Sequence, residues 1–529
     1  MDIYDYVIIG AGSAGCVLAN RLSEDLKVRV LLLEAGPKDT NPWIQIPIGY
    51  AKNLYNSSLN WCFATQPESE LDGRSLHLPA GKVLGGSSSI NGLLYVRGQH
   101  QDYDDWAALG NYGWSWQDVL PYFKKSEKQE RGADEWHGVS GSLSVSNGRD
   151  THPLCDAFIK SAESLGIPAN PDFNGERQEG VGYYQMTASK GRRVSSAKAF
   201  LKPAMQRTNL TVLPCAKVLK IVLKDKCADS VIYQVRGSYR QVTARRGVVI
   251  AAGAINTPAI LQRSGIGPAE VLKHADVPLQ RELPGVGSNL QDHLQAKLVF
   301  QSAKPNTLND AASSLIGRLK IGAEYLLTQR GWLTVAAGQA GGFVRTEVAQ
   351  DRPDVQFHVM AMSSLDPRKG PDAFSGFTIS ACQLRPESRG FVQISGAELH
   401  DPLHVQFNYL TAEKDRRTLL AGLKLARKIA AKDPLSGQLV SEQRPGPEAD
   451  EDESLLKYVR RFAGSVFHPA GTCKMGHDDM AVVDPTLRVH GVENLFIADA
   501  SVMPTLISGN TNAASIMIGE HAAALIRAG

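Results

Sequence analysis

The chain has 529 residues, more than the roughly 250–300 that one hydrophobic core supports, so two or three domains are expected. Its 57 Lys and Arg side chains nearly balance 54 Asp and Glu, and this formal charge of +3 argues against nucleic acid as a partner. The seven cysteines lack CxxC or CxH spacing and no apolar run reaches about 18 residues, which argues against a disulfide framework, a metal site and a membrane-spanning helix.

A β-α-β unit opens the chain. Residues 5–9 form a β-rich run, residues 13–25 follow a helical pattern, and residues 28–36 form a second strand. The turn between the first strand and the helix carries a GxGxxG motif, and an acidic residue ends the second strand. This context predicts a dinucleotide-binding site, in which the helix N-terminus faces a pyrophosphate.

The four residues of this fingerprint have separate expected roles. Gly10 allows the tight turn, Gly12 lets the backbone approach the pyrophosphate, and Gly15 allows close packing of the helix. Glu34 is placed to accept hydrogen bonds from a ribose. An acid at this position disfavours NADP, and it leaves NAD and FAD open.

Loops and then a second set of elements follow. Residues 37–80 are rich in Pro, Asn and aromatics and predict long ordered loops, and helices are expected to start near Asp102 and Trp116. A further helix is predicted within PLCDAFIKSAESLG, and two more central strands are predicted within TVLPCAKVLKIVL and QVTARRGVVIAAGAI.

The middle of the chain changes character. The runs FVRTEV, DVQFHVMAM, GFTISACQL and FVQISG predict a separate antiparallel sheet, with helices at 313–328 and 412–431. The strand ENLFIADAS and a final helix end the chain. We therefore predict an α/β protein in which a sheet-rich domain is inserted into a Rossmann-like domain.

Two long segments carry a family resemblance. GKVLGGSSSINGLLYVRGQHQDYD (81–104) and GAINTPAILQRSGIG (253–267) resemble the two signatures of the glucose-methanol-choline oxidoreductases. LPGVGSNLQDH and FHPAGTCKMG are also similar to family segments, so the resemblance covers nearly the whole chain. It implies an FAD-binding domain at 1–150, 205–298 and 464–529, and a substrate-binding α+β domain at 151–204 and 299–463.

The resemblance also implies which residues bind FAD. In some family members a histidine just before the matching asparagine bonds covalently to the flavin, and because Ile90 holds that place here, we expect non-covalent FAD. The expected cofactor residues are Gly10, Gly12, Ser13, Ala14, Gly15, Glu34, Ala35, Gly85, Gly86, Ser87, Asn91, Gly92, Val218, Asp499, Ala500, Asn510 and Thr511.

The expected catalytic pair is His468 and Asn510. Oxidation of an alcohol needs a base for the hydroxyl proton and a donor for the developing alkoxide, and a neutral imidazole suits the first task. By resemblance His468 is the base and Asn510, 42 residues later, is its partner. His293 in NLQDH is interpreted as structural support. The expected substrate wall consists of Trp61, Gln339, Phe343, His358 and Met360.

The overall pattern is similar to bacterial dehydrogenases for aliphatic alcohols, polyethylene glycol and L-sorbose, and no cage for a quaternary ammonium group is evident. We expect oxidation of a primary alcohol or sugar alcohol, with electrons passed to a quinone or other non-oxygen acceptor. An alcohol oxidase that uses O₂ and, in another class, a hydroxynitrile lyase remain alternatives. We expect a cytoplasmic protein, and leave open contact with the inner face of a membrane and the oligomeric state.

Overall fold

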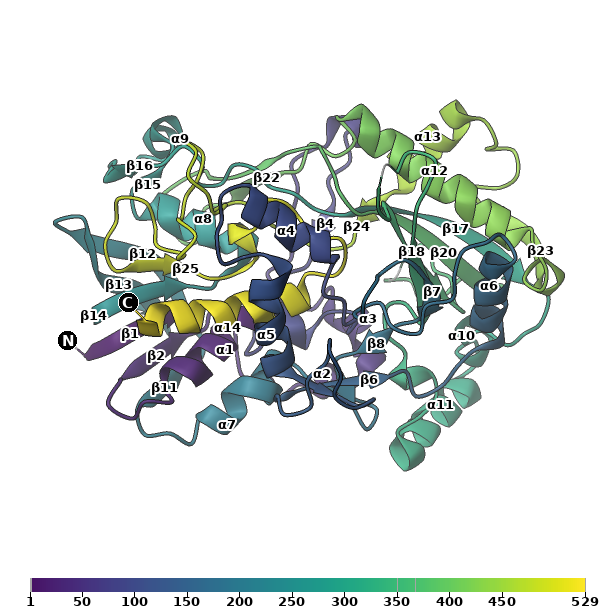
Figure 1. Cartoon of the computed structure of the whole chain (residues 1–529), viewed down its shortest axis with the longest axis horizontal. Coiled ribbons are helices and arrows are strands. Elements are labelled where there is room, and N and C mark those ends of the chain that lie inside the picture. Colours follow the sequence, from purple (N-terminus) through teal and green to yellow (C-terminus); the bar gives the residue numbers. More distant parts are fainter. Residues whose placement is uncertain (1, 350, 367, 529) are drawn as a thin grey trace.

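A computed structural model describes residues 2–349, 351–366 and 368–528 (Figure 1). The predicted β-α-β opening is confirmed as β1 (Ile3–Ile9), α1 (Ser13–Leu22) and β2 (Val30–Leu33). Strand β1 is buried from Asp5 to Ile9 because it lies between two parallel neighbours.

The first sheet has seven strands in the order β11-β2-β1-β14-β13-β12, with β25 also paired to β14. Strands β11, β2, β1, β14 and β25 run parallel, and β12, β13 and β14 form an antiparallel meander. Ile9 pairs with both Leu33 and Ile250, so three strands end at one edge, where ligands bind in such sheets. The added strands are β11 (Leu210–Leu213), β12 (Ala216–Lys224), β13 (Cys227–Val235), β14 (Ser238–Ile250) and β25 (Leu495–Ile497).

Two helices from opposite ends of the sequence pack together beside this sheet. Helix α14 (Asn512–Ala528) lies against α1 so closely that a Cβ on Gly519 would come within 2.9 Å of the Ala14 backbone. The buried Glu520 carboxylate accepts two hydrogen bonds from the Arg21 guanidinium, at 2.8 and 2.7 Å. The start and end of the chain therefore lie together, at the left of Figure 1.

The second sheet is antiparallel, in the order β23-β17-β20-β19-β18-β7, with β24 also paired to β17. Helices α6, α12 and α13 cover one of its faces (Figure 1). Its strands are β7 (Gly180–Tyr183), β17 (Leu294–Ser302), β18 (Ala340–Val344), β19 (Val355–Met360), β20 (Gly376–Gln383), β23 (Leu439–Arg444) and β24 (Gly464–Ser465), and the helices are α6 (Pro153–Glu163), α12 (Glu413–Ala430) and α13 (Asp452–Phe462).

One strand that was predicted for this sheet belongs to another sheet. The run FVQISG forms β21 (Phe391–Ile394), which pairs with β22 (Leu403–Gln406) in a separate two-stranded sheet. The Val392 N–H donates to the Gly287 carbonyl, and Leu290 and Gly390 exchange backbone hydrogen bonds, so the 283–293 segment holds this run away from the large sheet. The prediction of FVQISG as part of the large sheet was wrong.

Two of the predicted domain boundaries do not coincide with the ends of the packed elements. The boundary at 298 falls inside β17, which pairs with β20 from Gln295 to Gln301. The helical turn Ala197–Leu201 and α7 (Lys202–Ala204) pack against α1, although the prediction gave them to the substrate domain. The domain division remains a prediction, and these contacts would move its limits by several residues.

The remaining elements are short or lie at the periphery. Residues 37–80 form the expected ordered loops, with only short elements in them. The seven cysteines all carry free thiols. The other elements are α2 (Pro42–Gln45), α3 (Tyr50–Asn53), β3 (Phe63–Ala64), β4 (His77–Leu78), α4 (His100–Ala108), α5 (Trp116–Ser126), β5 (Glu127–Gln129), β6 (Leu143–Asn147), β8 (Gln185–Met186), β9 (Ala188–Ser189), β10 (Arg192–Arg193), α8 (Gly253–Arg263), β15 (Ile266–Gly267), α9 (Ala269–His274), β16 (Arg281–Glu282), α10 (Leu308–Ala311) and α11 (Leu315–Thr328).

Candidate active site

A cavity of about 910 Å³ lies between the carboxyl edge of the first sheet and the uncovered face of the second. Its lining comes from segments that are far apart in the sequence. Of the seventeen predicted cofactor residues, all but Gly15 and Gly85 line it. Those two have packing roles instead, since a Cβ on Gly15 would lie 1.9 Å from the Gly10 carbonyl oxygen, and the Gly85 N–H donates to the Ala11 carbonyl.

The N-terminus of α1 opens into this cavity. Its N-cap is Gly12, which offers no side-chain cap, and its first turn contains no acid, so its backbone N–H groups can hold an anion. A Cβ on Gly12 would meet nothing closer than 3.8 Å. Gly86, with φ +52°, lies against Gly12 and brings the second glycine-rich loop beside the first. This cradle fits a pyrophosphate.

Glu34 lies at the adjoining end of the cavity. Its two carboxylate oxygens accept from the backbone N–H groups of Ala11 and Gly36, at 2.9 and 2.8 Å. Burial raises the pKa of Glu34 to about 7. Val218 on β12 lines the same end. An acid beside an apolar wall fits the ribose and adenine of a dinucleotide.

Asp499 and Asn91 lie along the remaining length of the cofactor half. The Asp499 carboxylate accepts from the Gly253 N–H at 2.9 Å and from the Thr257 hydroxyl at 2.6 Å, which ties the start of α8 to the strand end after β25. The Asn91 side-chain oxygen accepts from Arg193 at 2.6 Å. Together with the glycine cradle, these groups fit FAD.

His468 and Asn510 face each other on the opposite part of the wall. The Nε2 atom of His468 lies 3.1 Å from the Asn510 amide nitrogen, and its Nδ1 atom lies 2.9 Å from Nδ1 of His293. His293 Nε2 lies 2.9 Å from the Leu384 carbonyl, which can only accept, so this nitrogen carries the proton. His293 Nδ1 then accepts from His468 Nδ1–H. His468 Nε2 is therefore unprotonated and accepts from the Asn510 amide.

Backbone geometry holds His468 in place. The residue before it, Phe467, has φ 68°, a conformation that bulky residues rarely adopt. Ser465 and Asp292 stabilise this turn, because the Ser465 hydroxyl accepts from Phe467 N–H at 2.7 Å and the Asp292 carboxylate accepts from His468 N–H at 2.6 Å. Asp292 and His293 belong to the NLQDH segment. The sequence indicated only a supporting role for His293, and the direct contact of His293 with His468 was not predicted.

Electrostatics keep the histidines of this cluster neutral. Burial, together with the neighbouring His293 and His358, lowers the pKa of His468 well below its usual value. Burial also lowers the pKa of His293 to about 4, and burial with His293 and Lys297 lowers that of His358 to about 4. A neutral imidazole with an unprotonated Nε2 can accept a proton from a hydroxyl group.

The predicted substrate wall is present in part. His358 and Met360 line the cavity next to the His468 side, and Trp61 lines it beside Lys217 and Lys82, which lie over its ring near the Val218 end. Gln339 and Phe343 are not among the lining residues. This part of the prediction needs correction, because Phe173 and Tyr184 cover the Phe343 ring and the Gln339 side chain lies near the Ala361 backbone.

Three polar residues in or directly behind this wall were not predicted from the sequence. Gln356 on β19 is fully buried and donates from Nε2 to the Asn510 side-chain oxygen at 3.2 Å, which orients the Asn510 amide toward His468. Gln295 and Lys297 on β17 line the cavity, and His293 directly precedes this strand. The two-residue spacing of 293, 295 and 297 was the available signal, since alternate residues share a strand face.

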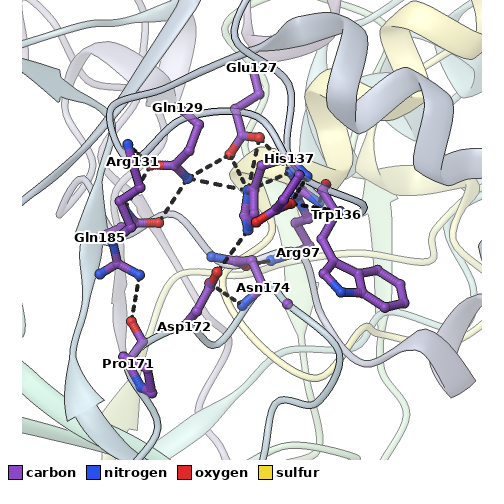
Figure 2. A network of polar contacts seen from close by, with 12 residues as sticks. Arg97, Glu127, Gln129, Arg131, Trp136, His137, Pro171, Asp172, Asn174 and Gln185 are labelled. Carbon is purple, nitrogen blue, oxygen red and sulfur yellow. Dashed lines mark hydrogen bonds and ion pairs between the residues drawn. The ribbon is translucent and has the colours of Figure 1, made fainter.

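A second polar cluster lies around Arg97 and His137 (Figure 2). Arg97 and Glu127 form a fully buried ion pair at 2.8 Å, and His137 bridges Glu127 at 3.0 Å and Asp172 at 2.8 Å. Asn174 accepts from the Arg97 N–H at 2.9 Å and donates to the Tyr95 carbonyl. The cluster thus fixes the segment that follows Leu93 and Leu94, which line the cavity.

This cluster predicts a pH-dependent stability. Burial alone would lower the pKa of His137, but its hydrogen bonds to Asp172 and Glu127 raise it to about 9. Because the folded pKa exceeds the unfolded value of about 6.5, the stabilisation is complete below that pH and is lost as pH rises through about 9. The stability advantage of the wild type over His137→Gln should therefore shrink by on the order of 2 kcal/mol between about pH 6.5 and 9.5. Denaturant unfolding measures this, and an unchanged difference would contradict it.

Comparisons with known proteins agree on one family. The model described as GMC oxidoreductase matches residues 4–295 with its N-terminal part and residues 386–519 with its C-terminal part. The chain is 42% identical to the alcohol dehydrogenase [acceptor] of Pseudomonas putida, over 99% of this chain and 96% of that protein, and 41% identical to human mitochondrial choline dehydrogenase, over 99% and 90%. The crystal structure of pyridoxine 4-oxidase from Mesorbium loti superposes with a TM-score of 0.89 at 34% identity, and covers 98% of both chains.

Proposed function

The chain belongs to the GMC oxidoreductase family, and we propose that it is an FAD-dependent dehydrogenase that oxidises a primary alcohol or sugar alcohol. The observation that carries the proposal is the His468–Asn510 pair, which faces the cavity with an unprotonated Nε2. We propose that FAD is bound non-covalently, because Ile90 lines the cavity where a bonding histidine would be needed.

The chain's own residues account for the movement of the proton. A substrate hydroxyl placed between His468 Nε2 and the Asn510 amide would give its proton to Nε2, and the amide N–H would then donate to the alkoxide oxygen. His293 keeps the Nδ1 proton of His468 directed away from the cavity, and Gln356 keeps the Asn510 amide nitrogen directed toward it. When bound, FAD supplies the hydride acceptor for this oxidation.

We propose a quinone or another non-oxygen molecule as the electron acceptor. The alcohol dehydrogenase [acceptor] of Pseudomonas putida, at 42% identity, supports this choice. An O₂-using alcohol oxidase is the second candidate, favoured by the similarity to pyridoxine 4-oxidase. Reoxidation of the reduced protein by a quinone analogue, measured against reoxidation by air, separates the two.

The charge of the substrate wall favours an uncharged alcohol over choline. Lys297 pairs across the sheet with Ser380, which in turn pairs with His358, so the three residues form one row. This row lies about 7 Å along the strands from the row of Gln295 and Gln356 beside Asn510. Among the described lining residues the only carboxylates are Glu34 and Asp499, and both lie in the cofactor half. A quaternary ammonium group would meet the Lys297 ammonium, with no carboxylate among the described lining residues of this half.

We therefore expect the protein to discriminate between alcohols by their charge. Under anaerobic conditions an aliphatic alcohol or polyol should bleach the flavin, whereas choline should do so with kcat/KM at least 10-fold lower. Lys297→Glu should raise kcat/KM for choline by about 10-fold, the equivalent of 1.4 kcal/mol. The control Lys128→Glu makes the same charge change at an exposed site. Choline as the best substrate of the wild type would contradict the charge argument, and no bleaching by any alcohol would contradict the function and favour the lyase.

A further inference from the structure

Helix α11 exposes a complete apolar face. Leu315, Ile316, Leu319, Leu326 and Leu327 are 73%, 67%, 65%, 77% and 85% exposed. At 100° per residue these five side chains fall within one sector of about 120°. Large apolar side chains exposed singly are ordinary, but five on one face of a 14-residue helix form a contiguous patch that points to an interaction site.

The opposite face anchors the helix to the protein. Tyr325 is buried, and its hydroxyl donates to the Gly191 carbonyl at 3.1 Å. Ser314 caps the first turn by accepting from the Gly317 N–H at 3.0 Å, and Gln329 ends the helix with a left-handed residue. Figure 1 shows α11 projecting at the lower edge of the molecule. The exposed leucines therefore belong to a folded, docked helix.

A basic groove adjoins the C-terminal end of α11. The groove is lined by Lys190, Arg192 and Lys198 together with Gln329, and it has a volume of about 550 Å³. The Gln329 side-chain oxygen accepts from Arg192 at 3.1 Å, which joins groove and helix. Burial and the nearby Arg192 and Lys202 lower the pKa of Lys198, as expected for clustered cations. No carboxylate is among the described residues that line this groove.

We propose that α11 and this groove form a binding surface for a membrane that contains anionic lipids. The apolar face would enter the boundary between headgroups and acyl chains, and the cations of the groove would contact lipid phosphates. Among the described residues, no helix is long and apolar enough to span a bilayer, so α11 would lie in the plane of the membrane. The overall charge of +3 gives no hint of this surface, because the cations are gathered locally.

The surface is connected to the active-site cavity. Helix α10 directly precedes α11, and its Leu308 lines the cavity. The neighbouring Asn309 donates to the Ser363 carbonyl at 3.1 Å, and Ser363, Ser364 and Leu365 also line the cavity, Leu365 while 61% exposed. An apolar alcohol or quinone dissolved in the bilayer would thus find the cavity wall continuous with the segment that contacts the membrane.

Flotation of the flavin-loaded protein with vesicles tests the proposal. Wild type should float with vesicles of phosphatidylcholine containing about 30% phosphatidylglycerol, and should be released by high salt. Leu319→Glu/Leu326→Glu should reduce the bound fraction at least 10-fold, whereas the control Leu26→Glu/Leu109→Glu, at positions 68% and 58% exposed, should bind like wild type. Lys190→Gln/Arg192→Gln should remove the preference for anionic vesicles.

Two results would overturn the proposal. The first is a folded, flavin-loaded wild type that stays unbound with these vesicles. The second is a wild type that forms a dimer in solution and does not bind the vesicles, and that Leu319→Glu/Leu326→Glu converts to a monomer. The apolar face would then be the contact between two copies of the chain. Thermal unfolding of each variant separates loss of binding from loss of fold.

Discussion

His468→Ala should slow anaerobic flavin reduction by alcohol about 10³-fold while the flavin stays bound, because general base catalysis contributes about 10²–10⁴-fold. The imidazole is the hydrogen-bond partner of the Asn510 amide nitrogen, at 3.1 Å, and it can take up a proton. Stopped-flow absorbance at saturating alcohol measures the rate. Acid precipitation, which should release flavin into the supernatant, measures the cofactor content.

The pH dependence gives this prediction a second readout. Because the pKa of His468 lies well below its usual value, the wild-type rate should hold its plateau through pH 6.5 and fall only at more acid pH. His468→Gln is the matched control for side-chain volume and should be as slow as His468→Ala. Flavin reduction at a near-wild-type rate in either variant would show that His468 is not the base.

His293→Leu should slow the same reaction about 10²-fold, although His293 is not a lining residue of the cavity. With leucine in place, the Nδ1–H of His468 loses its acceptor in a buried site, which costs about 1–3 kcal/mol. The imidazole then favours the tautomer with the proton on Nε2, and that nitrogen can no longer accept a proton from the substrate. His293 is therefore proposed as a positioning residue.

His293→Asn separates this role from a merely structural one. The asparagine side-chain oxygen can accept from His468 Nδ1–H, and its amide can donate toward the Leu384 carbonyl, so activity should recover to within about 10-fold of wild type. The loss in His293→Leu should appear in kcat more than in KM, because substrate contacts are unchanged. Equal activity of the leucine and asparagine variants would contradict the tautomer argument.

Sequence reasoning located the cofactor half of the site well because its constraints are local. Gly10, Gly12 and Glu34 are defined by a turn, a helix start and a strand end, each visible within a few residues. The pairing of His468 with Asn510 came from family resemblance, since nothing local relates two residues on different segments. The structure places them 3.1 Å apart, while their catalytic roles remain to be tested.

The substrate half was harder to predict because it depends on packing across a sheet. Alternation along a strand indicates a face, but not how far a cavity extends over that face. Phe343 shares a cross-strand row with Gln356, yet Phe173 and Tyr184 cover it beyond the cavity edge. Gln356 and Lys297 were overlooked, because their contacts arise only when β17, β19 and β20 lie side by side.

The packing of α1 against α14 joins two segments that are synthesised far apart in time. At about 5–20 residues per second, synthesis of this chain takes roughly half a minute to two minutes. The Ser13 hydroxyl donates to the Asn512 side-chain oxygen at 2.8 Å, and because the two residues are 499 positions apart, this contact forms only after the stretch between them has been translated. Until Asn512 has been synthesised, α1 and the glycine cradle at its N-terminus therefore lack the packing of α14.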